Sequence, residues 1–186
     1  NYKAAIQAYR GAKEKGCKKF IGVGSQAEYG KTQGIITENY PKNPTTQYGN
    51  YKLKAYSQIR NMGIADGITV IWPRLFSAYG QYDYPGTLIM SAIEKMKHNQ
   101  PLDLTECVQN WNYLYVKDIG QMLCQMGFAD CESGAYNLAS CDNRTLKEYV
   151  KELKQILKSS SELNFGAVMY GAEGMISFQP SINKFE

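Results

Sequence analysis

Histidine is almost absent from this sequence, and its cysteines follow no spacing typical of a metal site or a disulfide framework. His98 is the single histidine of 186 residues, and the five cysteines are odd in number and never spaced as C-x-x-C. Zinc sites draw their ligands from clusters of these two residue types. We therefore expect no metal site, no disulfide framework and no histidine-dependent nucleophile triad.

Long apolar runs and a strong charge of one sign are also lacking. Pro73, Arg74 or glycines interrupt the longest apolar runs before the ~18 residues that a membrane-spanning helix needs. The net charge of +4 is modest and the lysines are scattered, while 44% hydrophobic residues are typical of a globular domain. We expect a folded, soluble, cytoplasmic chain that binds neither membranes nor nucleic acid.

A glycine-rich phosphate-binding turn is the third absence. Neither G-x-G-x-x-G nor G-x-x-G-x-x-G occurs, and the sequence opens inside a helical pattern. A dinucleotide site of the Rossmann type needs such a turn between its first strand and first helix. Our expectation is that the sequence is the latter part of a larger protein whose phosphate-binding half lies upstream of Asn1.

Helix and strand patterns alternate through residues 1–80. Helix-spaced apolar residues over 1–16 stop at a glycine, and a short apolar run over 18–25 follows. A helix is then predicted over 45–61 and a strand over 67–76. Strand, helix and strand in this order predict a right-handed crossover and a parallel α/β sheet.

The alternation of helix and strand patterns stops after Gly80. Tyrosines surround Pro85-Gly86 there, in what we expect to be a long loop. We expect a second, smaller lobe of mixed helices and strands from this point. Thr145-x-x-Glu148 predicts a capping box at the start of the last helix, whose apolar stripe is typical of core packing. The elements expected in this lobe are helices over 87–99, 116–128 and 146–158 and strands over 102–105 and 135–139.

Ser25, Tyr48 and Lys52 are the candidate catalytic residues. Residues four apart share a helix face, so Tyr48 and Lys52 can point together towards the strand end that carries Ser25. A nearby ammonium favours loss of the phenol proton, which suits tyrosine to acid/base chemistry. A hydroxyl, a phenol and an ammonium around one carbonyl form a site for hydride transfer to or from a nicotinamide.

The Tyr-x-x-x-Lys spacing alone is weak evidence, because it occurs three times, at Tyr9/Lys13, Tyr48/Lys52 and Tyr113/Lys117. Only the middle copy lies between two buried-looking strands. The alternative interpretation is purely structural, with the tyrosine as a packing residue, the lysine as a solvated side chain and Ser25 as a cap of the following turn. The strand, helix and strand order favours the catalytic interpretation.

Several consecutive segments resemble the extended short-chain dehydrogenase/reductase family, which contains nucleotide-sugar epimerases, dehydratases and 4-ketoreductases. The resemblance covers nearly the whole chain and follows the family's order. Its segments are the Asn-led helix to Gly16, Phe20-Ile21-Gly22-Val23-Gly24-Ser25-Gln26-Ala27-Glu28-Tyr29-Gly30, Gln47-Tyr48-Gly49-Asn50-Tyr51-Lys52, Pro73-Arg74-Leu75-Phe76-Ser77-Ala78-Tyr79-Gly80, Asn112-Tyr113-Leu114-Tyr115-Val116-Lys117-Asp118 and Tyr136-Asn137-Leu138-Ala139.

This resemblance implies roles for individual residues. Ser25, Tyr48 and Lys52 would be catalytic, with Ser25 and Tyr48 also contacting the substrate. Tyr48 and Lys52 would also contact NAD or NADP, together with Asn1 and Phe76. Ser77 would stand where the family uses asparagine to contact the phosphates of a sugar nucleotide.

The resemblance also implies an organisation. The fold would be an incomplete Rossmann-type parallel sheet, its C-terminal half, with a smaller mixed α/β substrate-binding lobe. Residues 1–80 would form the second half of the NAD(P)-binding domain and 81–186 mainly the substrate lobe, with 107–130 returning to the first domain. The partners would be a nucleotide-sugar substrate and a second copy in a homodimer formed through helices that include 45–61.

Departures from the family pattern reduce the number of reactions that this chain is expected to catalyse. Dehydratases of this family place an Asp-Glu pair directly after the catalytic Ser or Thr, whereas this chain has Gln26-Ala27. The usual diphosphate-binding arginine is replaced by Trp111. Segments 24–30, 104–107 and 111–114 resemble the deoxysugar 4-ketoreductase branch more than the galactose epimerases, so we expect reduction of a 4-keto-6-deoxysugar. Sugar-nucleotide C4 epimerisation is the alternative within the class, and a non-catalytic sugar-nucleotide-binding or scaffold protein is the alternative from another class.

Overall fold

A four-stranded parallel sheet forms the centre of the computed structural model, which describes residues 2–171 and 174–185. Strand β4 (Thr69–Leu75) lies in the middle. On one side it pairs with β1 (Lys19–Ile21) and then β2 (Gly24–Ser25), and on the other side with β9 (Gly134–Leu138). The crossover from β2 to β4 contains a helix, as predicted for a parallel sheet.

The strand predicted over 18–25 is divided into β1 and β2 because of Trp72 on the neighbouring strand. A Cβ on Gly22 would lie 2.2 Å from the Trp72 ring, and a Cβ on Gly24 would lie 2.4 Å from its Nε1. The buried indole therefore lies directly against glycine backbone at these two positions. This close approach places Ser25 at the end of β2, beyond the tryptophan.

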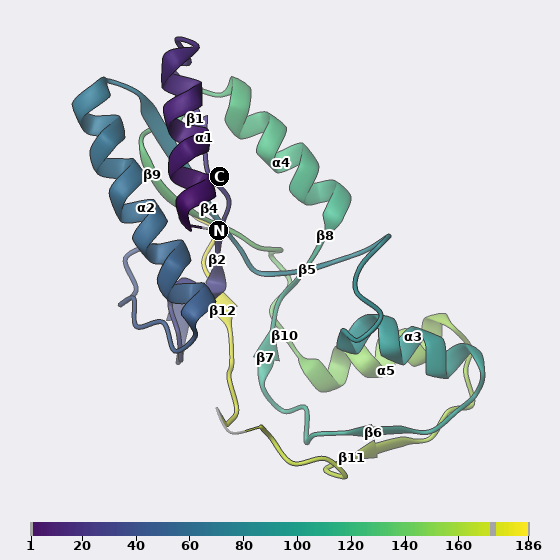
Figure 1. The fold of residues 1–186 in the computed structure, drawn as a ribbon. Coiled ribbons are helices and arrows are strands. Elements are labelled where there is room, and N and C mark those ends of the chain that lie inside the picture. Colours follow the sequence, from purple (N-terminus) through teal and green to yellow (C-terminus); the bar gives the residue numbers. More distant parts are fainter. Residues whose placement is uncertain (1, 172–173, 186) are drawn as a thin grey trace.

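Helices cover both faces of the sheet (Figure 1). The first two, α1 (Tyr2–Glu14) and α2 (Gln47–Asp66), pack together over the face that carries Val70 and Trp72. The opposite face carries Ile71 and is covered by α4 (Val116–Phe128). Neighbouring residues of a strand point to opposite faces, so β4 is apolar on both sides, as expected of a central parallel strand.

Helix α2 is longer than predicted, because Gly63 does not end it. A Cβ on Gly63 would lie 2.4 Å from Val70 Cγ2, so the glycine lets the helix approach β4 closely. Thr46 caps the first turn by accepting a hydrogen bond from the Gly49 amide. The helix ends at Gly67, whose φ of 65° is a left-handed conformation that glycine adopts readily.

The second lobe is built around helices α3 (Leu88–Lys97) and α5 (Leu146–Ile156). The capping box predicted for α5 is confirmed, since the Thr145 and Glu148 side chains each bond the other residue's backbone amide. Cys107 is buried in the core of this lobe. The short strand pairs of the lobe are β6 (Leu102–Leu104) with β11 (Leu163–Phe165) and β7 (Asn110–Trp111) with β10 (Arg144–Thr145).

The chain crosses between the two parts more than once. Strand β5 (Ser77–Tyr79) pairs with β8 (Tyr113–Tyr115) where the lobe joins the sheet. The segment predicted to return to the first domain, 107–130, contains α4, which packs on the sheet. Strand β9, which we expected in the lobe, pairs with β4 instead, so the return extends to Leu138.

The tail of the chain also returns to the first part. Strand β12 (Gln179–Pro180) pairs with β3 (Ile35–Ile36), close to the one-turn helix η1 (Gln26–Glu28) that follows β2. The polar sequence after Ser159 predicted neither β11 nor β12. Among the residues described, no helix has both the length and the apolar character that crossing a membrane would require.

Candidate active site

Ser25 lies at the junction of β2 and η1, at the carboxyl end of the sheet. It caps η1, because its hydroxyl oxygen accepts a hydrogen bond from the Ala27 amide at 3.2 Å. A serine hydroxyl that accepts one bond still has its own proton to donate. Ser25 is therefore held in place as a cap and remains able to donate a hydrogen bond to a ligand.

Tyr48 is positioned by the first turn of α2. The next residue, Gly49, contacts η1 so closely that a Cβ there would lie 2.3 Å from the Ala27 carbonyl oxygen. This contact brings Tyr48 beside Ser25. Tyr48 is 46% exposed, and its hydroxyl has no hydrogen-bond partner in the described part of the chain.

One cavity of about 320 Å³ joins Ser25 and Tyr48. Its walls come from η1, the start of α2, strand β7 and the segment before β12. None of the described residues that line it is charged. They are Ser25, Gln26, Ala27, Gly30, Thr45, Thr46, Tyr48, Trp111, Ile176 and Phe178.

Lys52 is not among the residues that line this cavity. Its Nζ donates a 2.7 Å hydrogen bond to the Val23 carbonyl and lies 5.8 Å from the centre of the Tyr48 ring. It lines a second cavity of about 200 Å³, together with Val23 and Trp72. Burial lowers the pKa of Lys52, and the negative charge of Glu28 opposes this shift. The expected common cleft is thus divided, because Ser25 and Tyr48 line one cavity whereas Lys52 lines another, where its ammonium bonds the Val23 carbonyl.

Glu28 is a buried residue that holds the backbone of Ser25 in place. It is fully buried, and its Oε1 accepts hydrogen bonds from the Ser25 amide at 3.0 Å and from Trp72 Nε1 at 2.9 Å. Its Oε2 accepts a 2.8 Å bond from Nε of the equally buried Arg74. One carboxylate therefore links the backbone of Ser25 to the central strand of the sheet.

The network continues from Arg74 to Tyr29. Arg74 Nη1 donates to the Tyr29 hydroxyl at 3.1 Å, and that hydroxyl donates to Asn137 Oδ1 at 2.6 Å. Burial raises the pKa of Tyr29 to about 12, although the charge of Arg74 opposes the shift. Tyr29 therefore keeps its proton near neutral pH and acts as a fixed hydrogen-bond link between β4 and β9.

The first of the other two Tyr-x-x-x-Lys copies is structural. Both Tyr9 and Lys13 bind the carboxylate of Asp66, at 3.0 Å and 2.7 Å. Burial, followed by the bond to Asp66, raises the pKa of Tyr9 to about 12. This copy fastens α1 to the end of α2 and does not suit proton transfer.

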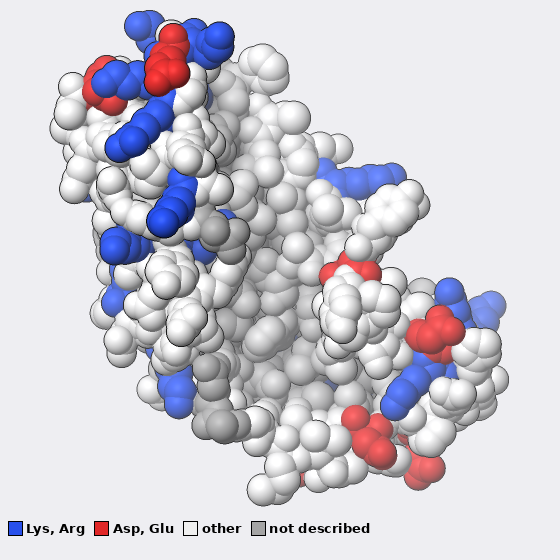
Figure 2. Space-filling model, in the orientation of Figure 1, with Lys and Arg blue, Asp and Glu red and all other residues white. Residues whose placement is uncertain are grey.

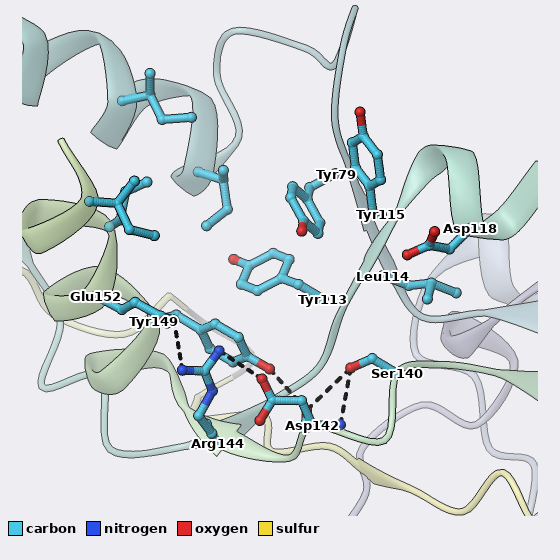
Figure 3. Close-up of a pocket in the computed structure, with 14 residues that line it drawn as sticks. Tyr79, Tyr113, Leu114, Tyr115, Asp118, Ser140, Asp142, Arg144, Tyr149 and Glu152 are labelled. Carbon is cyan, nitrogen blue, oxygen red and sulfur yellow. Dashed lines mark hydrogen bonds and ion pairs between the residues drawn. The ribbon is translucent and has the colours of Figure 1, made fainter.

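Tyr113, from the third copy, lines a groove of about 340 Å³ between the lobe helices and β5/β8 (Figure 3). Burial raises the pKa of Tyr113, which disfavours loss of its proton. The groove contains Arg144, which is paired with Asp142 and Glu152 at 2.7 Å each. Lys117 does not line this groove, so the pattern brings no ammonium to the Tyr113 phenol there.

Two further predicted site residues, Phe76 and Ser77, line neither of the two cavities. Phe76 is buried among Tyr29 and Phe178, and its side chain lines neither cavity. Ser77 lies on β5, opposite Tyr113 of β8. Asn1 lies outside the described residues. Roles for these three residues in binding cofactor or substrate stay predictions.

Comparison with known proteins gives a family for this arrangement. The sequence pattern of the NAD dependent epimerase/dehydratase family matches residues 1–139, which include Ser25, Tyr48 and Lys52. The chain belongs to this family. Of curated proteins, mouse dTDP-D-glucose 4,6-dehydratase (Mus musculus) is 26% identical over 152 residues, which cover 81% of this chain and 43% of that protein. CDP-abequose synthase of Salmonella muenchen is 31% identical over 97 residues, covering 51% of this chain and 33% of that protein.

Solved structures confirm the Rossmann-type fold. The UDP-glucuronic acid 4-epimerase of Bacillus cereus, in complex with NAD, superposes with a TM-score of 0.82 at 19% identity and covers 97% of this chain and 56% of that one. Other structures of the same fold hold NAD or NADPH. The chain spans less than half the length of the two curated relatives. Cofactor use by members of the epimerase/dehydratase family agrees with the predicted NAD or NADP.

The epimerase/dehydratase pattern did not reveal the Glu28–Arg74 pair, although two signals were present. Ser25-x-x-Glu28 is itself a capping-box sequence. Arg74 interrupts the most apolar strand of the chain, and a charge in such a strand requires a buried partner. Together these signals predict an ion pair at the end of β2.

The contact between Gly49 and η1 can be tested by substitution. We expect Gly49→Ala to lower the free energy of unfolding by about 1–3 kcal/mol, because the added Cβ overlaps the Ala27 carbonyl. Gly11→Ala is the matched control, since nothing lies within 4 Å of a Cβ there. The control should instead stabilise α1 by about 0.5–1 kcal/mol. Urea denaturation measures both, and equal effects of the two substitutions would contradict the close contact.

Proposed function

We propose that this chain carries the catalytic residues of an NAD(P)-dependent oxidoreductase/epimerase that acts on a nucleotide-linked sugar. The proposed reaction is reduction of a 4-keto-6-deoxysugar, with Tyr48 as the acid/base. The observation that carries this proposal is the shared cavity of Ser25 and Tyr48, with the Lys52 ammonium 5.8 Å from the centre of the phenol ring.

Each of the three side chains has a distinct role in the proposed reduction. Ser25 donates a hydrogen bond to the C4 carbonyl oxygen, which draws charge onto that oxygen. When bound, the reduced nicotinamide supplies the hydride that C4 receives. Tyr48 gives its proton to the same oxygen, so the carbonyl becomes an alcohol. The Lys52 ammonium stabilises the phenolate that Tyr48 leaves behind.

The free donors of Lys52 suit a cofactor ribose. An ammonium has three N–H donors, and the Val23 carbonyl takes one of them. The cavity that Lys52 lines is also lined by Phe20 of β1 and by Val23, which is 39% exposed. We propose that Tyr48 and Lys52 hold the nicotinamide ribose here, with Asn1 and Phe76 as further cofactor contacts.

The uncharged cavity favours reduction or epimerisation over dehydration. Loss of water from a sugar needs an acid and a base, and Gln26 and Ala27 occupy the positions where dehydratases carry them. Glu28 is the next carboxylate along the chain, and its two oxygens face Ser25, Trp72 and Arg74 inside the protein. Among the described lining residues, Tyr48 is therefore the one proton carrier.

Substrate identity is supported by the relatives. The two curated relatives are named for a dTDP-linked and a CDP-linked sugar, so we propose a dTDP- or CDP-linked substrate.

C4 epimerisation is the second candidate, because the same tyrosine can remove a proton from C4–OH and return it after hydride transfer on the other face. A homodimer formed through α2, with Ser77 at the substrate phosphates, is part of the proposal.

An assay of the full-length protein tests the proposal. We expect loss of NAD(P)H absorbance with dTDP- or CDP-4-keto-6-deoxyglucose, and no release of 4-keto sugar from dTDP-glucose. Interconversion of nucleotide-linked glucose and galactose would instead identify an epimerase. Binding of the sugar nucleotide without turnover would reject catalysis and support a scaffold.

A further inference from the structure

Glu28 bonds the walls of both cavities through a single oxygen atom. Its Oε1 accepts hydrogen bonds from the Ser25 amide at 3.0 Å and from Trp72 Nε1 at 2.9 Å. Ser25 lines the cavity that it shares with Tyr48, and Trp72 lines the cavity that contains Lys52. The shared acceptor atom therefore holds the two walls at a fixed separation, although Glu28 itself lines neither cavity.

Helix capping alone does not explain why this carboxylate is buried. In the capping boxes of η1 and α5, a glutamate side chain bonds the backbone amide of the cap residue. Glu148 does so from an exposed position at the start of the 11-residue α5. Glu28 caps a helix of only three residues, yet it is fully buried and paired with the buried Arg74. A buried ion pair is often no more stabilising than apolar residues of the same volume, so the pair indicates a further role.

The position of the Ser25 hydroxyl depends on Glu28. Glu28 fixes the Ser25 amide, and the hydroxyl oxygen of Ser25 accepts a 3.2 Å bond from the Ala27 amide. The hydroxyl proton is left for a ligand. Gly24 makes the fit close, because a Cβ there would lie 2.6 Å from Glu28 Oε1. A group that bonds a reacting carbonyl has to be held within about 0.5 Å of its working position.

Lys52 is held by a separate contact. Its Nζ bonds the Val23 carbonyl at 2.7 Å, and no bond joins it to Glu28. The negative charge of Glu28 favours the ammonium form of Lys52, because it opposes the decrease in pKa that burial causes. A change at Glu28 should therefore displace Ser25 and leave the position of Lys52 unchanged.

We propose that Glu28 is a positioning residue, which holds the Ser25 hydroxyl at a fixed place relative to the Lys52 cavity so that it can bond the reacting carbonyl. Arg74 supplies the positive charge that keeps the buried carboxylate ionised. This inference rests on the proposed function, because the carbonyl is that of the sugar in that proposal. It adds a residue that acts on the reaction through Ser25 alone.

Two variants of the full-length protein separate positioning from a general effect of charge. Glu28→Asp keeps the charge beside Arg74 but withdraws the oxygen from the Ser25 amide, because the side chain is one methylene shorter. Glu28→Gln/Arg74→Met removes both charges but keeps an amide oxygen as the acceptor. We expect kcat for NAD(P)H oxidation to fall about tenfold in the first variant and about threefold or less in the second. The KM for NAD(P)H should stay unchanged in both, since Val23 holds Lys52.

The Ser25→Ala background tests whether Glu28 acts through Ser25. There, Glu28→Asp should cause no further loss of kcat. Glu148→Asp is the matched control, because it makes the same change in the exposed capping box, and it should leave kcat unchanged. Urea denaturation checks that each variant is folded. If Glu28→Asp does not fold, Glu28→Met/Arg74→Met replaces it, and it should be about tenfold slower than Glu28→Gln/Arg74→Met, from which it differs in the acceptor oxygen.

Three results would overturn the inference. They are wild-type kcat in the variant without the acceptor, a greater loss in Glu28→Gln/Arg74→Met than in that variant, and an undiminished effect of Glu28→Asp in the Ser25→Ala background. Each of them leaves the proposed function standing, because the wild-type protein still turns over the sugar nucleotide. Absence of turnover in the wild-type protein would reject the proposed function, and the positioning of Ser25 for that reaction together with it.

Discussion

Replacement of Tyr48 by phenylalanine should reduce turnover about 10²- to 10⁴-fold, the usual contribution of a positioned acid/base group. The substitution removes the one proton carrier among the described lining residues of the cavity. The fold should persist, because the Tyr48 hydroxyl has no partner in the described part of the chain. The measurement is kcat for NAD(P)H oxidation in the full-length protein, with urea denaturation as the check on folding.

Tyr82→Phe is the control for this experiment. Tyr82 is 94% exposed and lines neither the Tyr48 cavity nor the Lys52 cavity. It should keep kcat close to the wild-type value. Full activity of Tyr48→Phe would reject Tyr48 as the proton donor, and an equal loss in both variants would show that the effect is not specific to Tyr48.

Replacement of Arg74 by methionine should have the largest effect on stability. The substitution leaves the buried Glu28 carboxylate without its cation, and removing one partner of a buried pair costs about 3–5 kcal/mol. Denaturation followed by tryptophan fluorescence reports the loss, because Trp72 lies in the core beside Glu28. Adding Glu28→Gln should recover part of the stability, since the unpaired charge is then gone.

Arg144→Met provides the comparison for a more exposed arginine. Arg144 is paired with Asp142 and Glu152, and all three side chains are at least 33% exposed. Ion pairs of this kind contribute about 0–1 kcal/mol. A loss as large for Arg144 as for Arg74, or no recovery in the Glu28→Gln/Arg74→Met double variant, would contradict the buried-charge explanation.

Local sequence patterns predicted elements in both parts of the fold. The strand over 67–76 and the Thr145 capping box follow from neighbouring residues, and the structure confirms both. The errors came from contacts between distant residues. Gly63 continues α2 because it faces Val70, and β9 joins the main sheet because it pairs with β4.

In the candidate site too, sequence spacing predicted some residues, whereas contacts between residues far apart in the sequence were not predicted. Spacing and order were sufficient to select Ser25 and Tyr48, which the structure places in one cavity. Spacing gave no sign that the Lys52 ammonium would bind the Val23 carbonyl. Ile176 and Phe178 also line the cavity, and no pattern within the polar tail linked them to Ser25.

The position of that tail has a consequence for biosynthesis. Ile176 and Phe178 complete the wall beside Ser25, and β12 then joins β3. Because a chain emerges from the ribosome in order, Ser25 and Tyr48 are both outside the ribosome before this wall exists. The cavity is finished only when residues 176–178 have also emerged, so a nascent chain halted in the lobe would hold its reactive tyrosine in an open, unshielded half-site.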